Sequence, residues 1–304
     1  MDWNDDEMQV QTDNLLYKKL VKEDIPALRE VLKYHDWKYY DQAEPSISDI
    51  EYDKIFKALN ALETAHPELI TKDSPTQRVA QVLNTAFTSV AHRVPMLSLS
   101  NSYNAEDLNA FDESVMKLSN KEEIAYCVEP KFDGASIALV YENDILVRAA
   151  TRGDGTFGEE ITANAKQIKN IPRTAAFSKY GISKIELRGE VVIENGLFDK
   201  MNIEREKEGL KVFQNSRNTA SGSLRMKDPE EVGKRNLEAF IYQIGYVVDQ
   251  DQNELLGRVF TSHFQNIEML AELGFQVPGK EKTLSKNIHE VVDFIKTWEE
   301  KRDG

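Results

Sequence analysis

A lysine between two acids is the group in this sequence best suited to nucleophilic chemistry. It lies in the segment EPKFDG, residues 129–134, in which Glu129 and Asp133 flank Lys131. A lysine amine attacks only when it is deprotonated, and holding it neutral at pH 7 costs about 4.6 kcal/mol from a reference pKa near 10.4. Desolvation or a nearby cation would reduce that cost, whereas the two acids alone would increase it. The motif therefore predicts a bound metal ion or another cationic group, although a solvated strand end with a turn glycine explains it about equally well.

A glycine-rich segment, TRGDGTFG at 151–158, is the second motif and contains Arg152. Its glycines satisfy the G-x-G-x-x-G pattern of dinucleotide-binding turns, which would favour a hydride-transferring oxidoreductase. Two features oppose that interpretation. The preceding strand belongs to a predicted hairpin, and no acid lies about 20 residues further on, where a ribose partner is expected. A turn that needs glycines with positive φ explains the segment better.

Two further segments carry polar groups that suit nucleotide or phosphate binding. Glu190, in the predicted strand ELRGEV at 186–191, is suited to accept ribose hydroxyls or hold a metal, but a surface strand with alternating charges is the simpler explanation. Residues 211–235 carry six bases against three acids, and Arg217 and Arg225 lie there among small polar residues. That composition suits phosphate contacts, with a solvated loop as the alternative.

The fifth candidate is a group of tyrosines and acids near the N-terminus. Asp49, Tyr52 and Asp53 lie at i, i+3 and i+4 on one face of a predicted helix, and Tyr39 and Tyr40 end the helix before it. Acids and tyrosines together can bind a cationic aromatic ring through charge and cation–π contacts. Helix packing is the usual explanation for such a stripe.

The elements that must position these residues change type along the chain. Apolar residues at helical spacing from Leu15 to Asp41, and a capping box formed by Ser48 and Glu51 before a second helix, predict a helical module over 1–86. Residues 1–13 hold five acids and no base, and we expect them to be disordered.

Hairpins mixed with helices follow, which predicts an α+β fold of mostly antiparallel sheets with flanking helices. We expect a hairpin turn at 142–144. The expected strands are 124–129, 135–141, 145–151, 184–193 and 237–248, and the expected helices are 105–118, 159–169, 262–273 and 287–300.

Composition excludes several classes of protein. The 304 residues are 40% hydrophobic with a net charge of −14, as in soluble globular proteins. No run approaches the ~18 apolar residues of a membrane helix, and the acidic N-terminus does not resemble a signal peptide, so we expect a cytoplasmic protein. Cys127 is the single cysteine, which excludes an internal disulfide, and the five histidines lack metal-ligand spacing, so no residue is assigned to a metal. The acidic balance argues against nucleic-acid binding over the whole surface.

Taken in order, these segments resemble the N-terminal part of the bacterial NAD+-dependent DNA ligases. The resemblance covers nearly the whole chain from about residue 28. It is carried by YYDQAEPSISDIEYD (39–53), HPELITKDSPTQRV (66–79), VPMLSLSN (94–101), EPKFDG (129–134), ATRGDGTFGEEIT (150–162), ELRGEVV (186–192) and FQNSRNTASGSLR (213–225).

The resemblance implies a helical subdomain that binds nicotinamide mononucleotide (NMN), 1–86, followed by an ATP-grasp-like nucleotidyltransferase domain, 87–304. Lys131 would attack the α-phosphate of NAD+, release NMN and hold AMP, with Asp133 supporting the lysine and Mg2+ as the metal. The other implied roles are NMN binding by Tyr39, Tyr40, Asp49, Tyr52 and Asp53; nucleotide contact by Ser98, Leu99, Glu129, Arg152 and Glu190; and contact with the AMP phosphate or nicked double-stranded DNA by Arg217 and Arg225.

The sequence also departs from the family pattern. Tyr40 replaces a histidine, Ala80 a glycine and Ser216 a proline, and the chain ends at Gly304, before a D-G-V-V-I-K strand and a second lysine motif. The resemblance therefore implies a monomeric, truncated chain that retains NAD+ binding and performs at most the first step of ligation. The alternative is a truncated, non-catalytic paralogue that binds NAD+ or NMN, or an interaction module.

Overall fold

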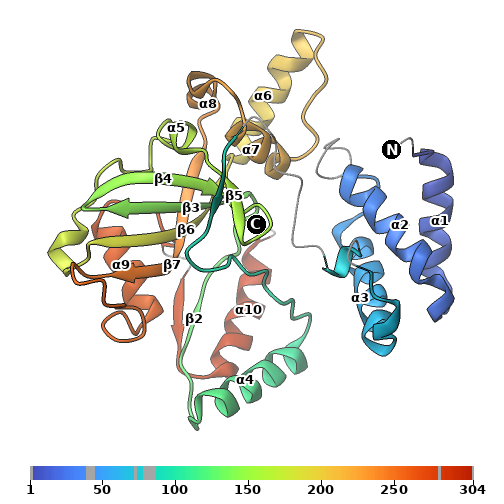
Figure 1. Cartoon of the computed structure of the whole chain (residues 1–304), viewed down its shortest axis with the longest axis horizontal. Coiled ribbons are helices and arrows are strands. Elements are labelled where there is room, and N and C mark those ends of the chain that lie inside the picture. Colours follow the sequence, from blue (N-terminus) through green and yellow to red (C-terminus); the bar gives the residue numbers. More distant parts are fainter. Residues whose placement is uncertain (1–2, 39–44, 72–73, 78–86, 280–281, 303–304) are drawn as a thin grey trace. The chain divides into compact units, whose positions relative to one another are not determined.

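The computed structural model describes residues 3–38, 45–71, 74–77, 87–279 and 282–302. The chain divides into two compact units, which are described one at a time below (Figure 1). The first, called the helical unit, comprises 1–83 and 195–219, and the second, called the sheet unit, comprises 84–194 and 220–304. We expected a boundary after residue 86 and did not expect the segment 195–219 to group with the helical unit.

Three helices make the core of the helical unit: α1 (Asp5–Tyr17), α2 (Ile25–Asp36) and α3 (Asp49–Ala65). Leu28 and Leu32 of α2 lie one turn apart and, with Ile55 and Leu59 of α3, are almost fully buried in one cluster. The predicted capping box is confirmed, since Ser48 N donates to Glu51 Oε2 at 2.8 Å and Glu51 N donates to Ser48 Oγ at 3.3 Å.

The prediction of disorder over 1–13 is wrong for Asp5 to Asp13, because α1 begins at Asp5. The Asn4 side chain caps this helix by accepting hydrogen bonds from the Asp6 and Glu7 backbone amides. Three acids in its first turn interact favourably with the positive end of the helix dipole. The negative charges that suggested a solvated chain end therefore stabilise the start of a helix. Met8 is buried against the core.

A buried carboxylate fixes the segment after α3 in place. Glu63, 1% exposed, accepts a hydrogen bond from Arg29 Nε at 2.7 Å and one from Ser74 Oγ at 2.7 Å, and it also accepts from Thr76 Oγ1. Burial opposes its charge, but these donors hold the pKa of Glu63 below its ordinary value. We call Glu63 and its three donors the Glu63 clamp.

The sheet unit is built on four antiparallel strands in the order β4-β3-β6-β7 (Figure 1). This arrangement confirms the α+β prediction. The predicted hairpin at 142–144 is confirmed by positive φ at Asn143 and Asp144, the conformation of a two-residue type I′ turn. The four strands are β3 (Ala135–Glu142), β4 (Ile145–Thr151), β6 (Lys184–Val192) and β7 (Glu238–Val248).

Two small antiparallel pairs extend the unit. They are β1 (Ser89–Ala91) with β5 (Phe157–Glu159), and β2 (Tyr126–Val128) with β8 (Thr283–Ser285). The predicted helix at 159–169 is wrong for most of its length. Its first residue, Glu159, is the last residue of β5, and the helix α5 covers only Thr162–Ala165.

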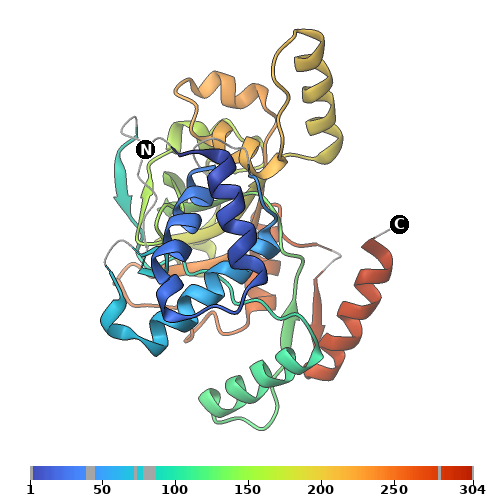
Figure 2. The same ribbon diagram turned by 90° about the vertical axis from the view of Figure 1, so that its right-hand side faces the viewer.

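Helices cover the edges of these sheets. α9 (His263–Glu272) lies against β7 (Figure 1), and α10 (Ile288–Arg302) contacts both β2 and α4 (Ala105–Ser119), which lies near it in Figure 2. Helices not predicted from the sequence are α6 (Asn195–Lys207), α7 (Ser216–Leu224) and α8 (Pro229–Lys234), so the basic stretch is largely helical. None of the helices within the described ranges has the length and apolar character needed to span a membrane.

Candidate active site

Lys131 lies in the loop that joins β2 to β3, and its side chain is exposed. The neighbouring residues are held on the sheet. The Phe132 ring stacks on Phe240 of β7 with centroids 4.1 Å apart and planes 17° apart. A Cβ at Gly134 would lie 2.1 Å from the Val191 carbonyl oxygen, so only glycine permits this approach to β6. The loop therefore presents the lysine to solvent from a fixed base.

Glu190 lies on the same sheet, in the β6 position that pairs with Ser136 of β3. Ser136 Oγ donates to Glu190 Oε2 at 2.8 Å, and Glu190 is 7% exposed. Burial, followed by the charge of Glu190, raises the pKa of Tyr242 to about 12, and Arg152 acts on it in the opposite direction. The sheet therefore places the predicted residue Glu190 beside Ser136, and the charge of Glu190 helps keep Tyr242 protonated.

Glu129 contacts two residues that the sequence analysis did not select. Its Oε1 lies 2.9 Å from His263 Nε2, at the first residue of α9, and accepts a 3.3 Å hydrogen bond from Cys127 Sγ. Burial and the neighbouring Glu129 raise the pKa of the Cys127 thiol to about 12. Ser136 and Tyr242 were missed as well. Strand alternation places Ser136 on the face of Glu190, but His263 is 134 residues from Glu129 and gave no local signal.

The segment before Ser98 and Leu99 is held by hydrogen bonds to β6 and to the glycine-rich turn of the sheet unit. Arg93 N donates to Glu186 Oε2 at 3.2 Å, and an Arg188 guanidinium nitrogen donates to the Val94 carbonyl oxygen at 2.6 Å. Met96 is buried, and its amide donates to the Gly155 carbonyl oxygen at 2.8 Å. The predicted nucleotide contacts Ser98 and Leu99 follow directly and are exposed.

The glycine-rich segment forms the turn that the simpler interpretation predicted. Gly153 and Gly155 have φ of +56° and +88°, values that L side chains rarely adopt. Gly158 meets a different constraint, because its Cβ would lie 1.9 Å from the Thr151 carbonyl oxygen. The strand before the turn is antiparallel to β3, which differs from the parallel unit of a dinucleotide-binding fold.

Arg225 has a structural partner within the sheet unit. Its Nε lies 2.6 Å from Glu159 Oε2, and Glu159 is 1% exposed. A buried carboxylate needs such a partner, so the ion pair accounts for this arginine without a ligand. Arg217 lies in the first turn of α7 and is half-buried. Contact of either arginine with phosphate or DNA stays a prediction.

Comparisons with known proteins decide the family. Residues 84–304 match the NAD-dependent DNA ligase adenylation domain, and residues 18–80 match the DNA ligase-like, N-terminal NAD+-binding domain. The chain belongs to the NAD-dependent DNA ligase family.

Several DNA ligases are similar over most of this chain. Identity is 54% over 291 residues with the DNA ligase of Sulfurihydrogenibium sp. (strain YO3AOP1), covering 94% of this chain and 41% of that protein. It is 54% over 279 residues with that of Persephonella marina, covering 92% and 39%, and 50% over 287 residues with that of Aquifex aeolicus, covering 94% and 38%. The chain thus spans about two fifths of the length of these DNA ligases.

The residues implied by the ligase family in the NAD+-binding domain are only partly described. Tyr39 and Tyr40 lie outside the described residues, as does the side chain of Asp49, with which α3 begins. Tyr52 stacks on Phe56 with centroids 6.3 Å apart, and its hydroxyl donates to Asp36 Oδ1 at 2.7 Å. Asp53 is half-buried. Packing therefore occupies part of the Tyr52 surface, and the NMN-binding role of this group stays a prediction.

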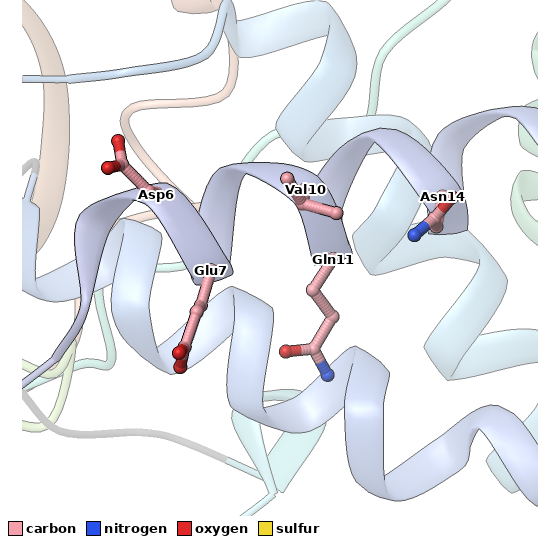
Figure 3. Close-up of a pocket in the computed structure, with 5 residues that line it drawn as sticks. All are labelled: Asp6, Glu7, Val10, Gln11 and Asn14. Carbon is pink, nitrogen blue, oxygen red and sulfur yellow. The ribbon is translucent and has the colours of Figure 1, made fainter.

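A shallow depression on α1 is unrelated to these ligase motifs. Figure 3 shows that the lining side chains all come from this single helix. The lining residues are Asp6, Glu7, Val10, Gln11 and Asn14.

The side chains near Lys131 are better suited to bind NAD+ than to form a preformed Mg2+ coordination site. Buried and half-buried carboxylates at Glu190 and Glu129 are suited to accept hydrogen bonds from ribose and base. Within the described ranges, a cluster of three or more Cys, His, Asp or Glu ligand atoms occurs at Cys127, Glu129 and His263 alone. Its sulfur and nitrogen donors do not suit Mg2+, which phosphate-transferring sites usually hold through substrate phosphates and one or two carboxylates.

Proposed function

We propose that this chain carries out the enzyme-adenylation step of an NAD+-dependent DNA ligase. The Nζ of Lys131 attacks the α-phosphorus of NAD+. A nitrogen–phosphorus bond forms as the phosphorus–oxygen bond to NMN breaks, the amine proton passes to solvent, and NMN leaves. The observation that carries the proposal is an exposed lysine on a loop whose neighbours are packed on β6 and β7.

The nucleotide would lie on the polar cluster beside this loop. Glu190, already placed by Ser136, is suited to accept a ribose hydroxyl, while Glu129 and Arg152 would line the adenosine pocket. Ser98 and Leu99 are exposed and follow the hydrogen-bonded segment 93–96, and they would cover the nucleotide. Water would then be partly excluded from Lys131, and this desolvation favours its neutral amine.

The helical unit would bind the other half of the cofactor. Asp49 and Asp53 would attract the cationic nicotinamide ring, and Tyr39, Tyr40 and Tyr52 would offer aromatic faces to it. Mg2+, bound with the phosphates of NAD+, would offset the charge that opposes attack on phosphorus. Asp133, next but one to Lys131, would support the lysine and this ion.

The later steps would belong to a complete ligase. AMP would pass from Lys131 to the 5′-phosphate of nicked double-stranded DNA, and a 3′-hydroxyl would displace it to seal the strand in replication and repair. Arg217 and Arg225 are the candidates here for contact with the AMP phosphate or DNA. The net charge of −14 indicates that most of the DNA-binding surface would lie in other domains.

Adenine-labelled NAD+ and Mg2+ test the first step directly. We expect the label to become covalently attached to the full chain, with one NMN released for each AMP retained. Lys131→Ala should retain no label, whereas Lys121→Ala, a matched exposed lysine of the same unit, should label normally.

Each contrary result has a distinct meaning. Label that persists in Lys131→Ala contradicts the nucleophile assignment. Saturable NAD+ binding without NMN release contradicts self-adenylation and favours the non-catalytic binding module. Reduction of the nicotinamide ring of NAD+ by an oxidisable substrate, without NMN release, would favour the oxidoreductase.

A further inference from the structure

Three side chains with different ligand atoms meet beside the loop of Lys131. Cys127 and Glu129 are two residues apart at the end of β2 and point to the same side, and His263 begins α9. The thiol sulfur lies 3.3 Å from Glu129 Oε1, and His263 Nε2 lies 2.9 Å from the same oxygen. All three ligand atoms lie within 4.8 Å of one another.

We propose that Cys127, Glu129 and His263 form a binding site for a thiophilic divalent cation of the Zn2+ class. One sulfur, one oxygen and one nitrogen ligand would leave a fourth tetrahedral position for water, as in open zinc sites. Ligand atoms around tetrahedral zinc are about 3.3–3.8 Å apart, given bond lengths of about 2.0–2.3 Å. The separations in the free site therefore require only small side-chain movements.

The balance of protons and charge is simple. On binding, the Cys127 thiol releases its proton to solvent, the His263 ring carries its proton on Nδ1, and Glu129 binds as a carboxylate. A dication then meets two anionic ligands. The nearby Lys282 ammonium is paired with Glu268 and lies 4.9 Å from the Phe264 ring centroid, so its charge has partners outside the site.

The ion is distinct from the Mg2+ of the proposed reaction. Mg2+ prefers oxygen ligands and binds sulfur and imidazole weakly, so it should not occupy this site. Burial and Glu129 raise the pKa of the free Cys127 thiol, so the residue is protonated and unreactive until a metal displaces the proton.

Occupation of the site has a consequence that rests on the proposed function. Glu129 is there assigned to the adenosine pocket, so a zinc ion and NAD+ would compete for the same carboxylate. Zn2+ should then slow adenylation, and excess NAD+ should restore it. The metal site itself does not depend on this assignment.

Co2+ titrated into the full chain without NAD+ tests the site directly. We expect a single equivalent to produce a thiolate-to-cobalt charge-transfer band, and Zn2+ to abolish it by displacement. Cys127→Ser should remove the band, and His263→Gln should weaken Zn2+ binding by about tenfold or more. His289→Gln is the matched control, since His289 is also exposed and lies on α10 of the same unit. Circular dichroism of each variant checks the fold.

The outcomes separate the two proposals. Absence of the band, or equal Zn2+ affinity in wild type, Cys127→Ser and His263→Gln, overturns the site. Zn2+ binding without inhibition of adenylation supports the site and overturns the competition at Glu129. A wild-type chain that binds Zn2+ but never acquires label, even without Zn2+, contradicts the proposed function and leaves the metal site supported.

Discussion

Glu63 in the helical unit and Glu129 in the sheet unit are both carboxylates with little solvent exposure, but they are bonded by different types of side chain. Glu63 is bonded by the permanent cation Arg29 and by two hydroxyls, all from its own unit. Glu129 contacts a thiol and a histidine whose side chain is 44% exposed. The first set is closed and holds the chain together. The second set is partly exposed to solvent, so Glu129, Cys127 and His263 could give up their contacts with one another in order to bind a ligand.

The largest contrast should come from Lys131→Ala. Covalent AMP should be lost completely, because no other group replaces the attacking amine. The free energy of unfolding should change by no more than about 0.5 kcal/mol, since the side chain is exposed. Labelling and urea denaturation on the same preparation measure both quantities. A large loss of stability would mean that Lys131 has a structural role as well.

Glu63→Gln should show the opposite behaviour. Removing one partner of a buried ion pair leaves Arg29 without its counter-charge, so the helical unit should lose about 3–5 kcal/mol of stability. Denaturant unfolding measures this loss. Glu68→Gln provides the control, because that carboxylate is 69% exposed beside His66. Equal effects in the two variants would contradict the distinction between closed and exposed pairs.

The helical unit should also weaken in mild acid through His35. This side chain is 3% exposed, with Thr12 Oγ1 2.9 Å from its Nε2, and burial lowers its pKa from 6.5 to about 4. Because the folded-state pKa lies below the unfolded one, the contribution is complete above pH 6.5 and is lost as pH falls toward 4. The loss attributable to His35 should approach about 3 kcal/mol.

Unfolding measured at several pH values isolates this contribution. His35→Gln should have a smaller slope of stability against pH between 6.5 and 4 than wild type, whatever its absolute stability. Equal slopes would mean that the buried carboxylates alone govern the acid sensitivity of this unit.

The smallest expected effect concerns the base of the lysine loop. Phe132→Ala removes the stack on Phe240, which should cost about 1 kcal/mol of stability and slow adenylation through a misplaced Lys131. Phe132→Tyr keeps the ring and should restore both. An unchanged rate in Phe132→Ala would show that the loop positions Lys131 without this stack.

Local signals predicted local structure well. The capping box of Ser48, the hairpin at Asn143 and Asp144, and the long strands were predictable because each depends on residues that are neighbours in sequence. The helix predicted at 159–169 was wrong for most of its length, since Glu159 belongs to β5, which pairs with the distant β1, and only Thr162–Ala165 is helical. The disorder predicted over 1–13 was wrong for Asp5 to Asp13 because acids at a helix start resemble a solvated tail.

The candidate site was predictable residue by residue but not as a set of contacts. Lys131, Glu129, Arg152 and Glu190 stood out by motif, and the sheet register pairs Glu190 with Ser136. The contact of Glu129 with Cys127 is local, but its contact with His263 depends on α9 lying close to the end of β2, which no periodicity reveals. The positions of Tyr39 and Tyr40 stay predictions.

The pairing of β2 with a late part of the chain has a consequence for the order of folding during synthesis. Glu129 and His263 are 134 residues apart in sequence, and β8, the partner of β2, is made later still. A ribosome adds about 5–20 residues per second, so Glu129 exists for about 7–27 s before His263 is made. Throughout that time β2 is an unprotected edge. β2 can therefore complete its pairing only when synthesis has passed β8, so this end of the loop that carries Lys131 takes its final structure late in the synthesis of the sheet unit.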